Sequence, residues 1–165
     1  ENAYKGSEMM KKRRLIYSLI LVISVFFFGA SFSGSAAPST YVHGIFSEKP
    51  LYVLDGTTGN WLTATSGNAI ASWTEHPLSS GNQAFFNAIS EVGSDRFEFR
   101  LVSLASTDVD EIKGKFDIYK NYTLVASGIP GTVYGLSQPV GNYYKFYDDT
   151  YSWHVSGYIT SRLDY

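Results

Sequence analysis

The chain of 165 residues carries 13 Lys and Arg against 15 Asp and Glu, a formal net charge of −2, and it contains no cysteine. Without cysteine, disulfides, thiolate zinc sites and cysteine nucleophiles are excluded, and burial of aliphatic and aromatic groups has to stabilise the fold. Because no basic cluster follows the N-terminal region, the acidic balance argues against nucleic acid and anionic membranes as partners.

The N-terminal region has the layout of a secretory signal peptide. A basic stretch, residues 11–14, precedes an apolar run over residues 15–28, and small residues follow as far as Ala37. The apolar run is shorter than the ~20 residues of a membrane span and no charged stop follows it, which favours cleavage over retention as an anchor. Residues 10–36 are therefore predicted to be a Sec signal peptide cleaved near Ala36, giving a secreted, extracellular protein without a stable membrane anchor.

Residues 1–9 are interpreted as an untranslated leader or a wrongly assigned start, with Met10 as the initiating residue. The Lys-Gly-Ser-Glu sequence at residues 5–8 can be encoded by a purine-rich stretch that resembles a bacterial ribosome-binding site. We therefore expect a bacterial, Gram-positive origin.

The rest of the chain is predicted to be a linker, residues 37–50, and one β domain, residues 51–165. Short apolar or alternating runs are separated by Gly, Asn, Asp, Ser and Pro, and the runs "LYVL" and "WLTAT" flank the turn-rich "DGTTGN". In "RFEFRLVSL" apolar and polar side chains alternate with the period of a half-buried strand. No segment shows a convincing helical stripe. This pattern is typical of an all-β sandwich or barrel, and we expect a single antiparallel β-sandwich of the jelly-roll kind.

A recognisable order of features runs between residues 81 and 160. It begins with a strand that contains Asp and Tyr, followed by a turn and "LVAS". A Gly-Tyr-Tyr strand and a final strand ending in Gly-Tyr come after them. The residues concerned are Asp117, Tyr119, Leu124–Ser127, Gly141–Tyr144 and Gly157-Tyr158. This order resembles the bacterial pre-peptidase C-terminal module, which implies a secreted jelly-roll β-sandwich. Lys120 stands where that module has a second Asp, and the module normally accompanies a protease, which this chain does not contain.

Catalytic motifs are not found in the sequence. The histidines His43, His76 and His154 are far apart and none has a metal-ligand spacing. His154 is expected to be a solvent-facing or hydrogen-bonded residue of a strand. Glu98 and Asp117 could face each other on neighbouring strands as glycosidases require, but a sandwich of this composition offers such pairs by chance. We therefore expect no enzymatic activity, with a small hydrolase as the remaining alternative.

One acidic loop offers oxygen ligands for calcium. Asp108, Asp110 and Glu111 lie within "STDVDEIKG", and Asp148 and Asp149 form a second candidate. Calcium takes six to eight oxygen ligands, and alternating acidic residues in a loop can direct two carboxylates at one point. The first three residues are the predicted calcium site, with solvated turns as the alternative.

The segment "YYKFYDDTYSWHVSGYI" is predicted to be a β-hairpin with two different faces. Its apolar face holds Tyr144, Phe146, Trp153 and Val155, and its mixed face holds Tyr143, Lys145, Tyr147, His154 and Tyr158. The apolar rings are expected in the core, while rings beside polar groups stack on sugars or anchor proteins. The alternative is that they are cross-strand pairs that stabilise the sheet. The predicted ligand-binding residues are Tyr143, Tyr147, Tyr151, His154 and Tyr158.

These observations favour a secreted, monomeric, non-enzymatic protein that binds cell-wall or environmental polysaccharide. A secreted effector, such as a small bacteriocin, toxin or protease inhibitor acting on an extracellular protein or a cell, is the alternative.

Overall fold

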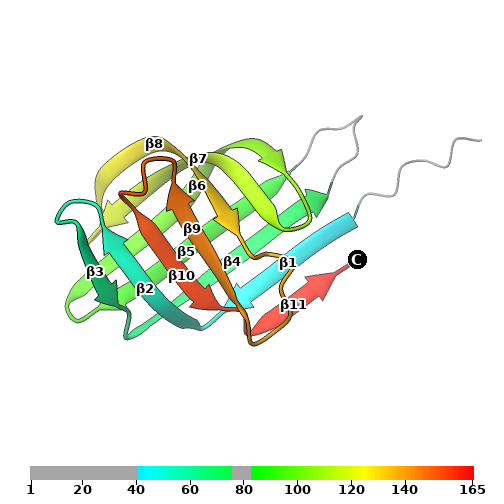
Figure 1. Ribbon diagram of the computed structural model, residues 1–165, viewed down its shortest axis with the longest axis horizontal. Helices are drawn as coiled ribbons and strands as arrows, with labels where there is room; N and C mark the ends of the chain where they lie inside the picture. The colour runs from blue at the N-terminus through cyan, green and yellow to red at the C-terminus, as the bar shows by residue number, and fades with distance from the viewer. Residues whose placement is uncertain (1–40, 76–82) are drawn as a thin grey trace, which may run out of the picture. The chain divides into compact units, whose positions relative to one another are not determined.

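The computed structural model describes residues 41–75 and 83–165, which are all-β and contain eleven strands (Figure 1). Within these ranges no helix is long and apolar enough to cross a membrane. The predicted start, signal peptide and cleavage position, and His76, lie outside the described residues. The strands are β1 (Tyr41–Ser47), β2 (Lys49–Asp55), β3 (Asn60–Thr63), β4 (Ser66–Glu75), β5 (Ala84–Val92), β6 (Asp95–Thr107), β7 (Glu111–Lys120), β8 (Thr123–Tyr134), β9 (Tyr143–Asp148), β10 (His154–Tyr158) and β11 (Ser161–Asp164).

All eleven strands belong to one antiparallel sheet in the order β11-β1-β4-β5-β6-β7-β8-β9-β10-β2-β3. The all-β prediction is confirmed, but the described strands form one sheet curled into a half-barrel rather than the two stacked sheets of a jelly roll. In Figure 1, β9, β10, β2 and β3 lie in front of β4 to β7. One residue separates β1 from β2, and two separate β10 from β11. Each of these short connections joins strands that lie near opposite ends of the sheet order.

The linker prediction is wrong for residues 41–50. Residues 41–47 form β1, which pairs with β4 and β11, and β2 begins at Lys49. The inward side chains of β1 are His43, Ile45 and Ser47, all buried. Only one of these three is a large apolar residue, so the segment lacks the hydrophobic alternation by which a strand is identified from sequence.

The core lies between the two arms of the curled sheet and consists mainly of aromatic rings. Phe99 of β6 packs against Phe146 of β9 at a centroid distance of 5.6 Å, and Phe86 of β5 lies 5.9 Å from Tyr144 of β9. The four side chains are fully buried. Truncating one such ring to alanine costs about 3–5 kcal/mol, so these contacts hold the arms together without disulfides.

A glycine fixes how closely β10 approaches the core. Gly157 of β10 lies opposite Tyr144 of β9, and a Cβ atom on it would come within 2.9 Å of the Tyr144 ring and 2.8 Å of Ser47 Oγ. The missing side chain leaves space for the Tyr144 ring to lie inward. Strands β9 and β10 can therefore lie flat against the core, with their outward side chains on one surface.

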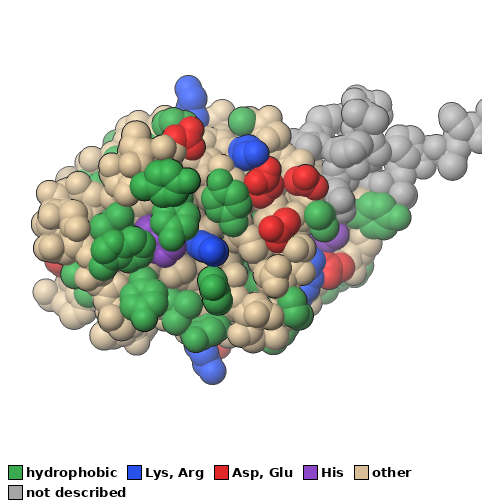
Figure 2. All heavy atoms as spheres, viewed as in Figure 1, with side chains coloured by type: hydrophobic (Ala, Val, Ile, Leu, Met, Phe, Trp, Pro, Cys, Tyr) green, Lys and Arg blue, Asp and Glu red, His purple; other side chains and the backbone are tan. Residues whose placement is uncertain are grey.

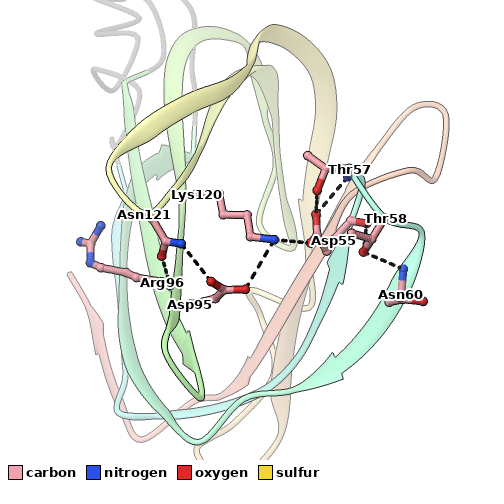
Figure 3. A network of polar contacts seen from close by, with 8 residues as sticks. All are labelled: Asp55, Thr57, Thr58, Asn60, Asp95, Arg96, Lys120 and Asn121. Atoms are coloured by element: carbon pink, nitrogen blue, oxygen red, sulfur yellow. Dashed lines mark hydrogen bonds and ion pairs between the residues drawn. The ribbon is translucent and has the colours of Figure 1, made fainter.

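A polar network joins the β2–β3 hairpin to the β6–β7 side of the sheet (Figure 3). The buried carboxylate of Asp55 accepts hydrogen bonds from Thr57 N at 2.9 Å and Lys120 Nζ at 2.8 Å, and Lys120 Nζ also lies 3.5 Å from Asp95 Oδ2. Burial by itself raises the pKa of Asp55, but the bonds from Lys120 and Thr57 outweigh it and hold the pKa below its ordinary value. The network therefore anchors the hairpin that carries Trp61.

Candidate ligand-binding face

Strands β9 and β10 turn alternate side chains to opposite sides of the sheet, as their sequence predicts. Tyr144, Phe146, Trp153 and Val155 are buried in the core. On the outer side Tyr143 lies opposite Tyr158, Lys145 opposite Ser156 and Tyr147 opposite His154. The hairpin and the composition of its two faces are confirmed, and four of the five predicted ligand-binding residues lie together.

The turn between these strands is held by Asp148, which is buried. Its Oδ1 accepts a hydrogen bond from Trp153 N at 2.7 Å, and its Oδ2 accepts bonds from the backbone N and the hydroxyl of Thr150. Tyr151 has a left-handed backbone, with φ of 56°, and its exposed ring lies 5.4 Å from the Tyr147 ring. The fifth predicted residue thus extends the same surface.

Two further rings come from distant positions in the sequence. Tyr52 of β2 and Trp61 of β3 are exposed on the same outer side, and Leu54 lies in register between Trp61 and His154. Because β2 pairs with β10, the rings of the β2–β3 hairpin extend the surface of β9 and β10. The aromatic face is defined here by these strands and by its outward residues, Tyr52, Trp61, Tyr143, Lys145, Tyr147, Tyr151, His154, Ser156 and Tyr158.

The aromatic face contains two adjoining hollows, separated by the outward side chains of β9. Figure 2 shows hydrophobic side chains gathered on this side of the molecule around a His and a basic residue. The strand hollow, of about 410 Å³, is lined by Leu51, Tyr52, Trp61, His154, Ser156 and Tyr158. The loop hollow, of about 520 Å³, is lined by Asp110, Tyr134, Gly135, Gln138, Asn142 and Tyr151. Both are also lined by the dividing residues Tyr143, Lys145 and Tyr147.

His154 forms part of the floor of the strand hollow. Its ring lies 4.9 Å from that of Trp61 and 4.3 Å from that of Tyr147, and only 3% of the residue is exposed. Burial lowers the pKa of His154 to about 4, so the imidazole is neutral at neutral pH. Its buried Nδ1 has no hydrogen-bond partner among the described residues. The expectation of a solvent-facing or hydrogen-bonded histidine is therefore wrong on exposure, while a hydrogen bond with the Phe146 backbone agrees with its second alternative.

The three carboxylates of the predicted calcium site are engaged separately. Asp108 Oδ1 accepts a hydrogen bond from Val109 N at 2.6 Å, Asp110 Oδ1 accepts from Ser137 N at 3.0 Å, and Glu111 lies 2.6 Å from Lys113 Nζ. Within residues 41–75 and 83–165 no group of three or more His, Asp or Glu side chains is placed to hold a metal. Of the second candidate pair, Asp148 is occupied by its turn. Calcium binding stays a prediction.

The glycosidase-like pair considered for Glu98 and Asp117 is not formed as two facing carboxylates. Glu98 lies opposite Tyr119, and Asp117 lies opposite Arg100. Glu98 is bound by Arg100 at 2.7 Å, and Asp117 Oδ1 accepts a bond from Gly128 N at 2.8 Å. Both groups are thus used in holding the sheet.

In the described ranges the two hollows bring outward Tyr, Trp and His rings together around Lys145. Comparison with protein-family models, curated proteins and solved structures finds no match to this chain. Any functional conclusion therefore rests on the chemistry of the aromatic face.

Proposed function

We propose that the protein is a secreted, non-enzymatic bacterial protein that binds a polysaccharide of the cell wall or the environment on its aromatic face. The observation that carries this proposal is the strand hollow, where the rings of Trp61, Tyr52 and Tyr143 are each about half exposed beside polar groups. Export is proposed from the predicted signal peptide.

Exposure of these rings is costly unless something covers them. Trp61 is 56% exposed, Tyr52 49% and Tyr143 46%. Each of these side chains can bury ~150–250 Å² of surface, and large exposed apolar patches mark interaction sites in soluble proteins. A pyranose ring has an apolar face that can cover an aromatic ring and hydroxyls that can bond to the tyrosine hydroxyls and Ser156.

The side-by-side position of the two hollows suits a chain of sugars that occupies both. Binding pockets for small ligands are typically about 300–1,000 Å³, so each hollow can accept one or two sugar rings. Tyr143, Lys145 and Tyr147 border both hollows. A linear polysaccharide crossing these three residues would contact both, and repeated weak contacts would add up along the chain.

The test is co-sedimentation of the protein with insoluble peptidoglycan, chitin and cellulose. Wild type is expected to pellet with at least one polymer, and the double variant Tyr143→Ala, Tyr147→Ala is expected to remain folded and to stay in the supernatant. Phe85→Ala is the matched control, because this half-exposed ring of β5 lies outside both hollows. Equal pelleting of the double variant and the control would disprove the site.

The same assay addresses calcium. If the acidic loop of Asp108, Asp110 and Glu111 binds calcium that supports the loop hollow, a chelator should reduce pelleting and added calcium should restore it. Pelleting that does not change with chelator leaves the sugar site intact and removes calcium from the proposal.

An extracellular protein is the second candidate partner, because Trp and Tyr are also the residues that dominate protein interfaces. Growth inhibition or protease inhibition by the purified protein, together with no pelleting on any polymer, would favour this effector function.

A further inference from the structure

Lys145 lies at the centre of the aromatic face. It is half-buried on β9 between the outward rings of Tyr143 and Tyr147, and it lines both hollows. Its Nζ lies 5.6 Å from the centroid of the Tyr143 ring. An ammonium group over an aromatic ring is attracted by the electrons of the ring, but this contact leaves its N–H donors unused.

The surroundings of Lys145 differ from those of the other described lysines. Lys120 and Lys113 each have a carboxylate oxygen within 2.8 Å. In the described ranges no ion pair joins Lys145 to a carboxylate within 4.0 Å. Lys49 and Lys115 also lack such a partner, but both are exposed to water. Among the described residues, Lys145 is thus a half-buried cation beside aromatic rings with no carboxylate within 4.0 Å.

The charges around the strand hollow favour an anion at this position. No Asp or Glu lines the strand hollow, and its histidine, His154, is neutral at neutral pH and has a buried Nδ1 without a hydrogen-bond partner among the described residues. The loop hollow contains Asp110, whose carboxylate would repel an anionic group. Since the whole chain has a net charge of −2, any attraction for an anion has to come from this local arrangement.

We propose that the polysaccharide is acidic, and that an anionic group on it, a uronate carboxylate or a phosphodiester, pairs with Lys145 in the strand hollow while its sugar rings cover Trp61 and Tyr143. This inference rests on the proposed function and specifies the class of its ligand. A charge-assisted hydrogen bond to a half-buried ammonium is stronger than the same contact at a fully exposed position. Lys145 would therefore determine specificity, and the rings would supply most of the contact area.

The experiment compares two ligands that differ only in charge. Oligogalacturonate and its fully methyl-esterified form have the same ring and linkage, and their binding to the full chain is measured by isothermal titration calorimetry. A glycerol-phosphate teichoic acid forms the second acidic arm and distinguishes the phosphodiester from the carboxylate. A neutral cello-oligosaccharide serves as the uncharged reference.

Three substitutions separate charge at this position from charge in general. Lys145→Met keeps most of the side-chain length and removes the charge, and it is expected to weaken binding of the preferred acidic ligand about tenfold. Lys145→Arg keeps the charge and should retain most of the affinity. Lys115→Met makes the same change on an exposed lysine of β7 outside both hollows and should have no effect.

The outcomes distinguish this inference from the proposed function. Preference for an acidic ligand that is lost in Lys145→Met supports both. Equal binding of the acid and its ester, binding of the neutral oligosaccharide alone, or an unchanged preference in Lys145→Met overturns the inference and leaves the proposed function standing. Failure of every saccharide to bind in solution, together with no pelleting on any polymer, overturns both.

Discussion

Two outer faces of the sheet both contain tyrosine rings and basic side chains. On one face these groups contact each other and a carboxylate, and on the other the basic side chain lacks a carboxylate partner among the described residues. On β5, β6 and β7, the charged face, Glu98 accepts hydrogen bonds from Asn87 at 3.0 Å, Arg96 at 3.0 Å and Arg100 at 2.7 Å. The two guanidinium groups lie over tyrosine rings, Arg96 over Tyr122 at 4.7 Å and Arg100 over Tyr119 at 5.2 Å. On the aromatic face, Lys145 has no carboxylate partner among the described residues. The rings of Tyr52, Trp61 and Tyr143 are about half exposed.

The difference shows that tyrosine content by itself does not identify a binding surface. The rings of Tyr119 and Tyr122 are already in contact with cations of the same protein. The rings of Tyr52, Tyr143 and Tyr158 instead line a hollow. The charged face is thus expected to contribute mainly to stability. The aromatic face is expected to determine binding, and its buried His154 adds a pH-dependent contribution to stability.

The largest effect is expected for Glu98→Ala. Burial alone raises the pKa of Glu98, but hydrogen bonds from Arg100, Arg96 and Asn87 outweigh it and keep the pKa below its ordinary value. Removing this carboxylate takes the nearest counter-ion from both guanidinium groups and leaves Arg96 only the longer contact with Glu91 at 3.7 Å, which should lower the free energy of unfolding by about 3 kcal/mol. Urea denaturation gives the change. Polysaccharide binding of the folded variant should match wild type, and loss of binding would break the separation.

The next effect concerns pH and comes from the aromatic face. The pKa of His154 is lowered to about 4 in the fold, so below its ordinary pKa the unfolded chain binds a proton that the folded chain does not. Stability is full above about pH 6.5 and falls by up to about 3 kcal/mol as the pH approaches 4. The contribution of Glu98, whose folded pKa is also lowered, is lost only below its ordinary value of 4.5.

Denaturation curves between these pH values separate the two contributions. His154→Gln should flatten the slope between about pH 6.5 and 4.5, and Glu98→Ala should leave that slope unchanged. An unchanged slope in His154→Gln would contradict the burial of a neutral imidazole in the strand hollow.

A smaller effect is expected for Asp55→Asn, which weakens the network of Figure 3. Losing the charge-assisted bond from Lys120 should cost about 2 kcal/mol. Because the network anchors the β2–β3 hairpin, we also expect weaker sugar binding through Trp61. Calorimetry and urea denaturation of the variant test both. Destabilisation without any change in binding would show that the hairpin keeps its place without the network.

The smallest effects on stability come from two tyrosines, one on each face. Tyr158→Ala in the strand hollow should change stability by less than about 0.5 kcal/mol and reduce binding severalfold. Tyr122→Ala should cost about 0.5–1 kcal/mol through the lost contact with Arg96 and leave binding unchanged. The reverse pattern in the two variants would contradict the assignment of functions to the faces.

The hairpin of β9 and β10 could be predicted from the sequence because its pattern is local. The alternation of Tyr143 to Tyr147 sorts side chains to two faces whatever the partner strand is. The arrangement of Trp61 and Tyr52 beside His154 depends on the pairing of β2 with β10, about a hundred residues apart in the sequence, which no local pattern encodes. The aromatic face was therefore only half predictable.

Neither the single sheet nor the separate bonding of the carboxylates in the acidic loop could be predicted, for a similar reason. Strand alternation is the same in a sandwich and in a curled sheet, and the difference lies in the short connections at Glu48 and at residues 159–160. Likewise the spacing of Asp108, Asp110 and Glu111 allows convergence, but the backbone amides of Val109 and Ser137 and the ammonium of Lys113 bind these carboxylates one by one.

The most direct test of the aromatic face is the quenching of tryptophan fluorescence by acrylamide. Trp61 is 56% exposed, whereas Trp73 and Trp153 are buried, so Trp61 should account for most of the accessible emission, and Trp61→Phe should remove it. Saturation with oligogalacturonate or the polymer that pellets the protein is expected to protect Trp61 from the quencher. Unchanged quenching while the ligand is bound would contradict the account, because the ligand would then lie elsewhere on the molecule.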